Sequence, residues 1–127
     1  MIYGIGTDII DIRRIKRVID IYGVRFKKKC FHEEEIEVSE KRYKSAESYA
    51  KRYAAKEACA KALGTGLARG VFWKDIEIKN NNFGKPFIIL HNNAKKYLEC
   101  NISKSANIEL SISDEVNFAL ANVIIFK

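Results

Sequence analysis

The sequence predicts an α+β protein in which an antiparallel sheet packs on a long helix. Three observations carry this expectation. The chain has 127 residues, which suffices for one core of ordinary size. Its C-terminal half holds short apolar segments separated by turns, a pattern typical of antiparallel hairpins. A long alanine-rich stretch without glycine or proline precedes them. We therefore treat residues 1–127 as a single domain.

The N-terminal part predicts a strand and then an amphipathic helix. Residues 2–10 are rich in isoleucine and contain glycines, which favours a buried strand whose backbone lies close to another element. From Asp11 to Tyr22, apolar residues recur every three or four positions and basic residues fill the gaps. Asp11 is placed to cap this helix and Gly23 to end it. An acidic cluster from Glu33 then indicates a short helix.

The strongest helical signal covers residues 45–63. Ser45 is suited as its N-cap, and Gly64 is expected to end it in a left-handed conformation. The remaining elements are a hairpin of strands 71–79 and 85–90, a short helix over 92–99, and strands over 107–113 and 117–126 around a turn at Asp114 and Glu115. The final strand is apolar on nearly both faces, so it should be central in its sheet.

Composition and charge limit the classes of protein. With 47% hydrophobic and 31% charged residues, the chain is not collagenous, low-complexity or wholly disordered. It shows no secretory signal, and no apolar run approaches the roughly 18–20 residues that span a bilayer, so we expect a cytoplasmic protein with no membrane partner. A net charge of +7 favours an acidic partner.

The cysteines do not indicate a disulfide framework or a zinc site. Cys30, Cys59 and Cys100 are widely spaced, and only His32 and His91 are available to join them as ligands. We expect reduced thiols that fill space.

Charged residues inside otherwise packed segments are the candidate site residues. Glu57 and Lys61 are one turn apart on a helix face that also carries small and aromatic residues. They form either an exposed ion pair, contributing a few tenths of a kcal/mol, or a metal-binding carboxylate beside a phosphate-binding lysine. Asp8 interrupts the end of the first strand and, because Asp11 is the better helix cap, it is free to join Glu57 at one Mg²⁺.

A glycine-bearing loop, Gly64 to Gly70, follows the long helix. It is not a P-loop, because it lies at the C-terminus of a helix, where the helix dipole repels phosphate. A phosphate bound here would need cations, and Lys61 and Arg69 are near in sequence. A simple turn is the alternative.

Three motifs occur together: Ile5-Gly6-Thr7-Asp8-Ile9, then Arg52-x-x-Ala55-Lys56-Glu57-Ala58-x-x-Lys61-Ala62-Leu63-Gly64-Thr65-Gly66, and later Gly84-Lys85-Pro86. They cover nearly the whole chain, which resembles the holo-[acyl-carrier-protein] synthase family, the small bacterial group of 4′-phosphopantetheinyl transferases. The resemblance implies an enzyme that moves the phosphopantetheine arm of coenzyme A to a serine of apo acyl carrier protein, releases adenosine 3′,5′-bisphosphate and supports fatty acid biosynthesis. It also implies a homotrimer with active sites between subunits.

The resemblance further implies residue roles. Asp8 and Glu57 would hold Mg²⁺, and together with Lys61 they would form the catalytic centre, with Lys61 on the phosphates. The serine proton would pass to Glu57 or to a metal-bound water, and the sequence leaves both open. The expected coenzyme A contacts are Lys61, Gly64, Arg69, Lys85, Pro86 and Ser111.

The basic helix is the expected dock for the acidic carrier protein. Its cations are Arg13, Arg14, Lys16 and Arg17, continued by Arg25, Lys27 and Lys28. A merely solvated helix face is the alternative. A rival function, nucleic-acid binding, has the net charge and nearby Tyr22 and Phe26 in its favour, but the aromatics form no stacking series and no binding motif is found. We therefore expect no nucleic-acid partner.

One departure from the family pattern lies near the C-terminus. Many members read His-x-Ser-x-Ser/Thr-His there, whereas this chain has Glu109-Leu110-Ser111-Ile112-Ser113-Asp114. Roles of those two imidazoles cannot be carried over. Ser111 and Ser113 are left as hydrogen-bond donors, and His32 and His91, which lie in different segments, are not expected to replace the missing pair.

Overall fold

A computed structural model describes residues 1–127. The elements in chain order are β1 (Ile2–Asp11), α1 (Ile12–Tyr22), α2 (Val24–Cys30), α3 (Glu33–Glu40), α4 (Ser45–Leu63), β2 (Ile76–Asn80), β3 (Pro86–Leu90), α5 (Asn92–Tyr97), β4 (Asn107–Glu115) and β5 (Phe118–Phe126). A 3₁₀ turn over Trp73–Asp75 precedes β2, and a π-helical turn over Leu98–Ile102 follows α5. The expected α+β class is confirmed.

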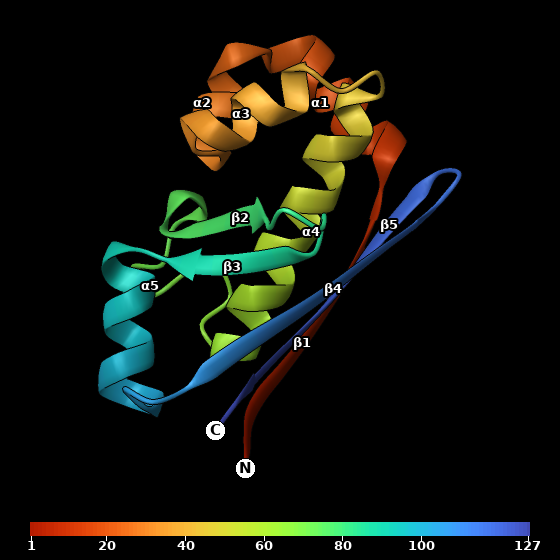
Figure 1. The fold of residues 1–127 in the computed structure, drawn as a ribbon. Coiled ribbons are helices and arrows are strands. Elements are labelled where there is room, and N and C mark those ends of the chain that lie inside the picture. The colour runs from red at the N-terminus through yellow and green to blue at the C-terminus, as the bar shows by residue number, and fades with distance from the viewer.

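The long helix α4 contacts both sheets of the fold (Figure 1). One sheet has the antiparallel order β1-β5-β4, and the other is the antiparallel hairpin β2-β3. The sequence predicted one sheet, and the structure has two because the hairpin packs on α4 separately. The final strand, β5, is central as predicted.

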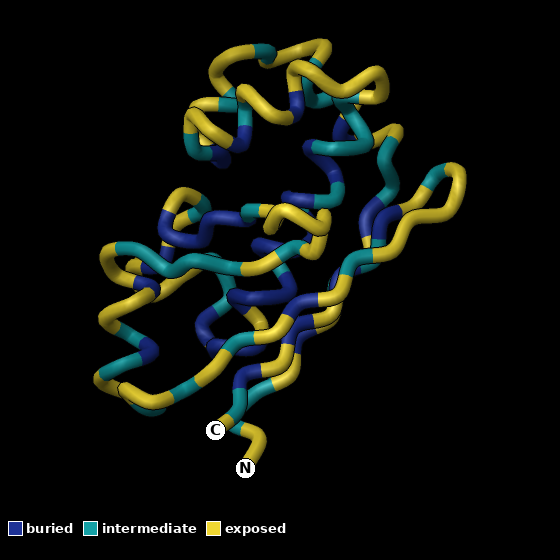
Figure 2. Tube along the Cα trace, in the orientation of Figure 1, coloured by how far each residue is buried: buried dark blue, intermediate teal, exposed yellow.

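Small residues bring α4 and the larger sheet close together. Alternate residues of β5 that face the helix are fully buried: Ala119, Ala121, Val123 and Ile125. The facing helix is also alanine-rich, with Ala54, Ala55, Ala58 and Ala62 buried. Figure 2 shows the resulting alternation of buried and exposed residues along the strands. Because most of these side chains are alanine, the backbones of the helix and the sheet can approach closely without leaving a cavity.

The other face of this sheet is uncovered in the single chain. Its apolar residues include Ile5 and Ile9, which are 62% and 64% exposed, and Phe118 and Ile124, at 44% and 38%. At its middle, the Thr7 hydroxyl donates to Asn122 Oδ1 at 2.7 Å. A patch of this kind on a small domain commonly marks an interface.

A buried ion network joins α3, α4 and β2. Lys56 Nζ donates to Glu35 Oε1 at 2.8 Å and to the carbonyl oxygens of Trp73 and Ile76. Glu35 Oε2 accepts from the Ile78 amide at 3.2 Å, and Arg52 lies 3.9 Å from the same oxygen. Every buried side-chain polar atom in the chain has a partner.

Several boundaries differ from the sequence predictions. The basic stretch after Gly23 forms the helix α2, which was not predicted. The first hairpin strand begins at Ile76 because Trp73–Asp75 turns instead, with Asp75 Oδ2 accepting from the Phe72 amide at 3.0 Å. Strand β1 continues past Asp8 to Asp11, and β4 extends through Asp114 and Glu115, so the turn that was placed there lies after them.

The helix caps were predicted with mixed success. Asp11 caps α1 as expected, accepting from the Arg13 amide at 2.9 Å, and Gly64 ends α4 with φ of 85°. Ser45 was wrong as a cap: it is the first helical residue, and no side chain caps α4.

No helix in the chain combines the length and apolar character needed to cross a bilayer.

Candidate active site

The candidate site starts from an unusually close contact between β1 and α4. A Cβ atom at Gly6 would lie 1.8 Å from the carbonyl oxygen of Ala58, and one at Gly4 would lie 2.0 Å from that of Ala62. The two backbones therefore touch, and only glycine fits at these strand positions. The expectation that the N-terminal strand lies against another element is confirmed.

This contact delivers Asp8, the next residue on the same side of β1, to α4. Lys61 Nζ donates to Asp8 Oδ1 at 3.1 Å and to the Thr7 carbonyl oxygen at 2.9 Å. The Lys61 side chain is 50% exposed and that of Asp8 only 14%. Because an ammonium group has three donors, one N–H of Lys61 is left for a ligand.

Glu57 lies beside this pair and is half-buried, with no protein hydrogen bond to its carboxylate. Burial and then the negative charge of Asp8 raise the pKa of Glu57, while Lys61 and Arg14 act in the opposite direction. The exposed Glu57–Lys61 ion pair that was one interpretation of the spacing is not formed, because Lys61 bonds to Asp8 instead.

The donor set of Asp8 and Glu57 fits a hard divalent cation. Two carboxylates on one side of an open site are the number that Mg²⁺ usually takes from a protein. Glu57 has free acceptor oxygens, and a cation would relieve the repulsion that raises its pKa.

The other predicted coenzyme A contacts do not all lie at this cluster. Gly64 and the exposed Arg69, whose φ is +56°, lie in the loop that follows Lys61. Lys85 lies on the hairpin and pairs with Glu109 of β4 at 3.1 Å. Ser111 and Ser113 are exposed on β4, on the face of the sheet that turns away from α4.

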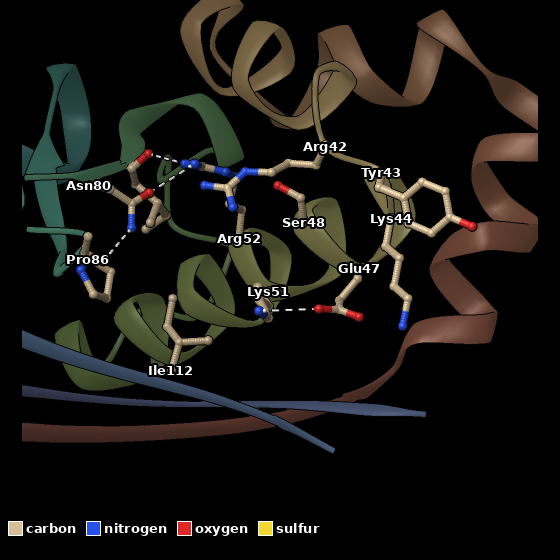
Figure 3. Close-up of a pocket in the computed structure, with 12 residues that line it drawn as sticks. Arg42, Tyr43, Lys44, Glu47, Ser48, Lys51, Arg52, Asn80, Pro86 and Ile112 are labelled. Carbon is tan, nitrogen blue, oxygen red and sulfur yellow. Dashed lines mark hydrogen bonds and ion pairs between the residues drawn. The ribbon is translucent and has the colours of Figure 1, made fainter. Parts of the chain in front are cut away.

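Pro86 lines a separate, strongly cationic pocket (Figure 3). The pocket has a volume of about 460 Å³, and its cations are Arg42, Lys44, Lys51 and Arg52. Arg52 is nearly buried and donates to the Ile78 carbonyl oxygen and to Asn80 Oδ1. Lys51 is paired with Glu47 and Asp114, but Arg42 and Lys44 form no ion pair. The pocket is therefore suited to an anion.

The pocket and the Asp8 cluster lie on opposite sides of α4. Ser48, in the pocket, and Glu57, in the cluster, are nine residues apart, which is about two and a half helical turns. A single ligand cannot reach both within one chain without passing around the helix.

The basic residues of the predicted dock are not equivalent. Arg13 pairs with Asp11 at 2.8 Å, and Lys27 pairs with Glu40 at 3.0 Å and lies over the Tyr49 ring. Lys16 pairs with Asp20 at 3.3 Å. Four exposed cations of the dock form no ion pair, namely Arg14, Arg17, Arg25 and Lys28. Arg14 acts on the pKa of Glu57, so it belongs near the cluster.

Sequence reasoning missed the cationic pocket and the proximity of two histidines. The run Lys41-Arg42-Tyr43-Lys44 was the signal for the pocket. His32 and His91 come together with their ring centroids 4.8 Å apart, although they are distant in sequence. Glu109 and Asp114, which stand where the resemblance leads one to expect histidines in many members, pair with Lys85 and Lys51.

All three cysteines are free thiols, as expected. Cys30 and Cys59 are buried, and burial raises the pKa of Cys59 to about 12. Cys100 is exposed, so it does not fill space in the core.

Comparison with known proteins identifies the family. The family model of the 4′-phosphopantetheinyl transferase superfamily matches residues 4–121. The holo-[acyl-carrier-protein] synthase of Agrobacterium fabrum is 51% identical over 127 residues, which cover 98% of this chain and 95% of that protein.

Solved structures give the same result. The holo-[acyl-carrier-protein] synthase from Neisseria meningitidis superposes with a TM-score of 0.88 at 40% identity, and the match covers 100% of both chains. The synthase from Bacillus anthracis, solved in complex with CoA (3′,5′-ADP), has a TM-score of 0.80 at 37% identity and covers 98% of this chain and 96% of that one.

Proposed function

Because this chain belongs to the 4′-phosphopantetheinyl transferase superfamily, we propose that Asp8, Glu57 and Lys61 form the centre of its transfer reaction. The enzyme transfers the 4′-phosphopantetheine group from coenzyme A to a serine of apo acyl carrier protein and releases adenosine 3′,5′-bisphosphate. The observation that supports the placement is the convergence of two carboxylates and a half-exposed lysine where β1 touches α4.

Asp8 and Glu57 are the residues that would hold Mg²⁺. Bound there, the ion supplies positive charge to the phosphate oxygens of coenzyme A. Lys61 adds a fixed positive charge through its free N–H, which can meet a pyrophosphate oxygen while Thr7 and Asp8 hold the ammonium in place.

The serine of the carrier protein must lose a proton as it attacks phosphorus. Glu57 is the group of this chain best suited to accept it, since its carboxylate has no protein partner. Burial favours its protonated form, whereas a Mg²⁺ held by the same carboxylate would lower its pKa, so a water at the site is the other acceptor to test.

The cationic pocket is suited to the phosphorylated nucleotide end of coenzyme A. Arg42 and Lys44 are unpaired cations, and Pro86 and Ile112 supply apolar surface beside them. Within one chain the pocket lies across α4 from Asp8 and Glu57, so a second copy must bring its own pocket to the cluster. The uncovered face of the β1-β5-β4 sheet gives an apolar surface for that contact. Both features support a homotrimer with shared active sites.

Mixing inactive variants tests the shared site. The Glu57→Gln variant has a disabled Asp8 cluster and an intact pocket. The double variant Arg42→Glu with Lys44→Glu has an intact cluster and a pocket without its unpaired cations. A mixed assembly should regain activity, because some interfaces combine an intact cluster with an intact pocket. No recovery in mixtures shown to exchange subunits, or a monomer in sedimentation equilibrium at micromolar concentration, would contradict the assignment.

The acidic carrier protein is placed on the exposed part of α1 and α2. The cations Arg17, Arg25 and Lys28 surround exposed apolar residues, of which Ile21 and Val24 are 72% and 61% exposed. Reversing Arg17 and Arg25 to Glu should weaken carrier-protein binding and lower its salt dependence, with coenzyme A binding unchanged. Lys95→Glu with Lys96→Glu on α5 makes the same charge change elsewhere and is the control. If the control variant weakened carrier-protein binding as much as the reversal of Arg17 and Arg25, the placement on α1 and α2 would be wrong.

A role in fatty acid biosynthesis and a place in the cytoplasm complete the proposal, since carrier-protein modification serves that synthesis. The direct test is release of adenosine 3′,5′-bisphosphate from coenzyme A in the presence of apo carrier protein. Release should require Mg²⁺. Full turnover in excess chelator would remove the metal from the proposal.

A further inference from the structure

Two histidines and a glutamate that the transfer reaction does not use come together on the outer side of the hairpin. His32 precedes α3, Glu77 lies in β2, and His91 follows β3. One ring nitrogen of each histidine and one Glu77 oxygen lie within 4.8 Å of one another. We propose that these three side chains form a binding site for a divalent transition-metal ion of the Zn²⁺ type, which joins α3 to the β2-β3 hairpin.

The donor chemistry selects this class of ion. Two imidazoles and one carboxylate are a ligand set that Zn²⁺ uses in proteins, with the fourth position left to water. Hard ions such as Mg²⁺ and Ca²⁺ prefer all-oxygen ligands, so the site differs in selectivity from the pair Asp8 and Glu57.

The existing hydrogen bonds already orient the ligands. His32 Nε2 lies 2.5 Å from the Lys74 carbonyl oxygen, which can only accept, so Nε2 carries the proton and Nδ1 keeps a free lone pair. Metal-bound histidines are commonly held in this way by a carbonyl group on the other nitrogen.

Glu77 is the least ordinary member of the group. It is 6% exposed, and the only hydrogen bond of its carboxylate is with His91 Nε2 at 2.8 Å. A nearly buried carboxylate with one partner favours binding of a second positive group. Zn²⁺ would take the place of the proton on His91 Nε2: the metal–nitrogen and metal–oxygen bonds form, the N–H bond breaks, and the proton leaves to water.

The distances require only a small adjustment. Two donors on a tetrahedral Zn²⁺, each at about 2.0–2.1 Å, lie about 3.3 Å apart. The 2.8 Å His91–Glu77 contact must open slightly, and the wider separations in the group, up to 4.8 Å, must close. A hollow of about 380 Å³ gives the ion a path from solvent, and its lining has three carboxylates against two lysines: His32, Glu33, Glu34, Lys74, Glu77 and Lys79.

Calorimetry with zinc chloride tests the site on the whole chain, prepared without a histidine tag, treated with chelator and measured without coenzyme A. The wild type should bind one Zn²⁺ per chain and show a higher thermal midpoint with zinc than without. His32→Ala and His91→Ala should each weaken binding by at least about tenfold and lose the thermal shift.

Three matched variants locate the ion. Glu34→Gln changes a carboxylate in the same hollow that bonds to Lys79 and not to the histidines. Cys100→Ser removes the exposed thiol, and Asp8→Asn disables the proposed Mg²⁺ site. All three should bind zinc as the wild type does. Circular dichroism checks that each variant is folded, and His91→Asn replaces His91→Ala if the latter is not.

The proposal is overturned if the wild type takes up no zinc, which would leave the His91–Glu77 contact as an ordinary hydrogen bond. It is also overturned if folded His32 and His91 variants keep full affinity, or if Asp8→Asn abolishes binding. None of these results depends on whether the transfer reaction has been assigned correctly.

Discussion

Two clusters of carboxylate and lysine begin at neighbouring residues of α4. They differ in how many of their hydrogen-bond donors and acceptors have a partner within the protein. Lys56 and Glu35 are 0% and 1% exposed, and each makes several hydrogen bonds inside the protein. Glu57, the next residue, has a carboxylate with no protein partner and lies beside Asp8 and the half-exposed Lys61. A single step along α4, from Lys56 to Glu57, thus separates a closed ion network from an open one.

The difference shows how the same residue types serve two purposes. A buried charge is tolerated when every donor and acceptor is met, and the Lys56 network meets this condition. Burial lowers the pKa of Lys56, and Glu35 counteracts that effect. In the Glu57 cluster, the carboxylate of Glu57 has no hydrogen-bond partner and is repelled by that of Asp8. A bound cation would stabilise both carboxylates. The two clusters contain the same residue types. They differ in whether every hydrogen-bond donor and acceptor has a partner within the protein.

The largest effect should come from the open cluster. Asp8→Asn and Glu57→Gln should each lower the transfer rate by about 10³-fold or more, because each removes a negative ligand while keeping the size of the side chain. Both variants should keep the wild-type circular dichroism spectrum. Rates of adenosine 3′,5′-bisphosphate release at saturating Mg²⁺ give the measurement, and near-normal turnover in either variant would contradict the role of the pair.

Mutations in the closed cluster of Lys56 and Glu35 should change the stability of the fold. Glu35→Ala leaves the buried ammonium of Lys56 without its counter-ion and should lower the free energy of unfolding by about 3–5 kcal/mol. The double variant Glu35→Leu with Lys56→Met removes both charges and should recover part of that loss. Urea unfolding measures all three proteins. A single variant as stable as the wild type would show that the network is not structural.

The contact that positions Asp8 should be nearly as sensitive. Gly6→Ala places a methyl group against the Ala58 carbonyl oxygen and should cost about 1–3 kcal/mol or more of stability, since backbone must move. It should also lower activity, because Asp8 moves away from Lys61. Adding Ala58→Gly should not rescue the variant, since the obstacle is backbone. Rescue by that second change would contradict the geometry.

The smallest effect is expected at an exposed pair. The Arg13 side chain, through its hydrogen bonds, lowers the pKa of Asp11 from 3.8 to about 2. The stabilisation from this carboxylate is therefore complete above about pH 4 and is lost as the pH falls toward 2. Asp11→Ala should lower the thermal midpoint at pH 6 and have a much smaller effect at pH 2, where about half of the carboxylate is protonated in the folded protein. An equal shift at both values would show that the charge is not responsible.

The sequence predicted the elements of this fold better than the relations between them. Apolar periodicity located α1, and an alanine-rich stretch without glycine or proline located α4. The apolar composition of the last strand correctly indicated its central place. It did not show that the hairpin forms a second sheet, because that depends on contacts between distant segments. Helix α2 was missed because its basic residues hid the apolar pair Phe26 and Cys30, which lie one turn apart.

The same limit applies to the site. Spacing on α4 and an odd carboxylate on β1 drew attention to Glu57, Lys61 and Asp8, and the resemblance to the family favoured a metal site over an ion pair. His32 and His91 come together only in the tertiary structure, and no pattern in the neighbouring sequence predicts their contact. The cationic pocket had a local signal, the basic run before α4, but only the hairpin that closes it made that signal meaningful.

Strand β1 pairs along its whole length with β5, and the Lys127 amide donates to the Met1 carbonyl oxygen at 2.9 Å (Figure 1). The strand that holds the residues around Asp8 in the sheet is thus synthesised more than a hundred residues after them. Contacts of such long sequence separation form late and slow folding. Until residues 118–126 have been synthesised, β1 lacks this partner strand, so Asp8 is not yet held at its place beside α4.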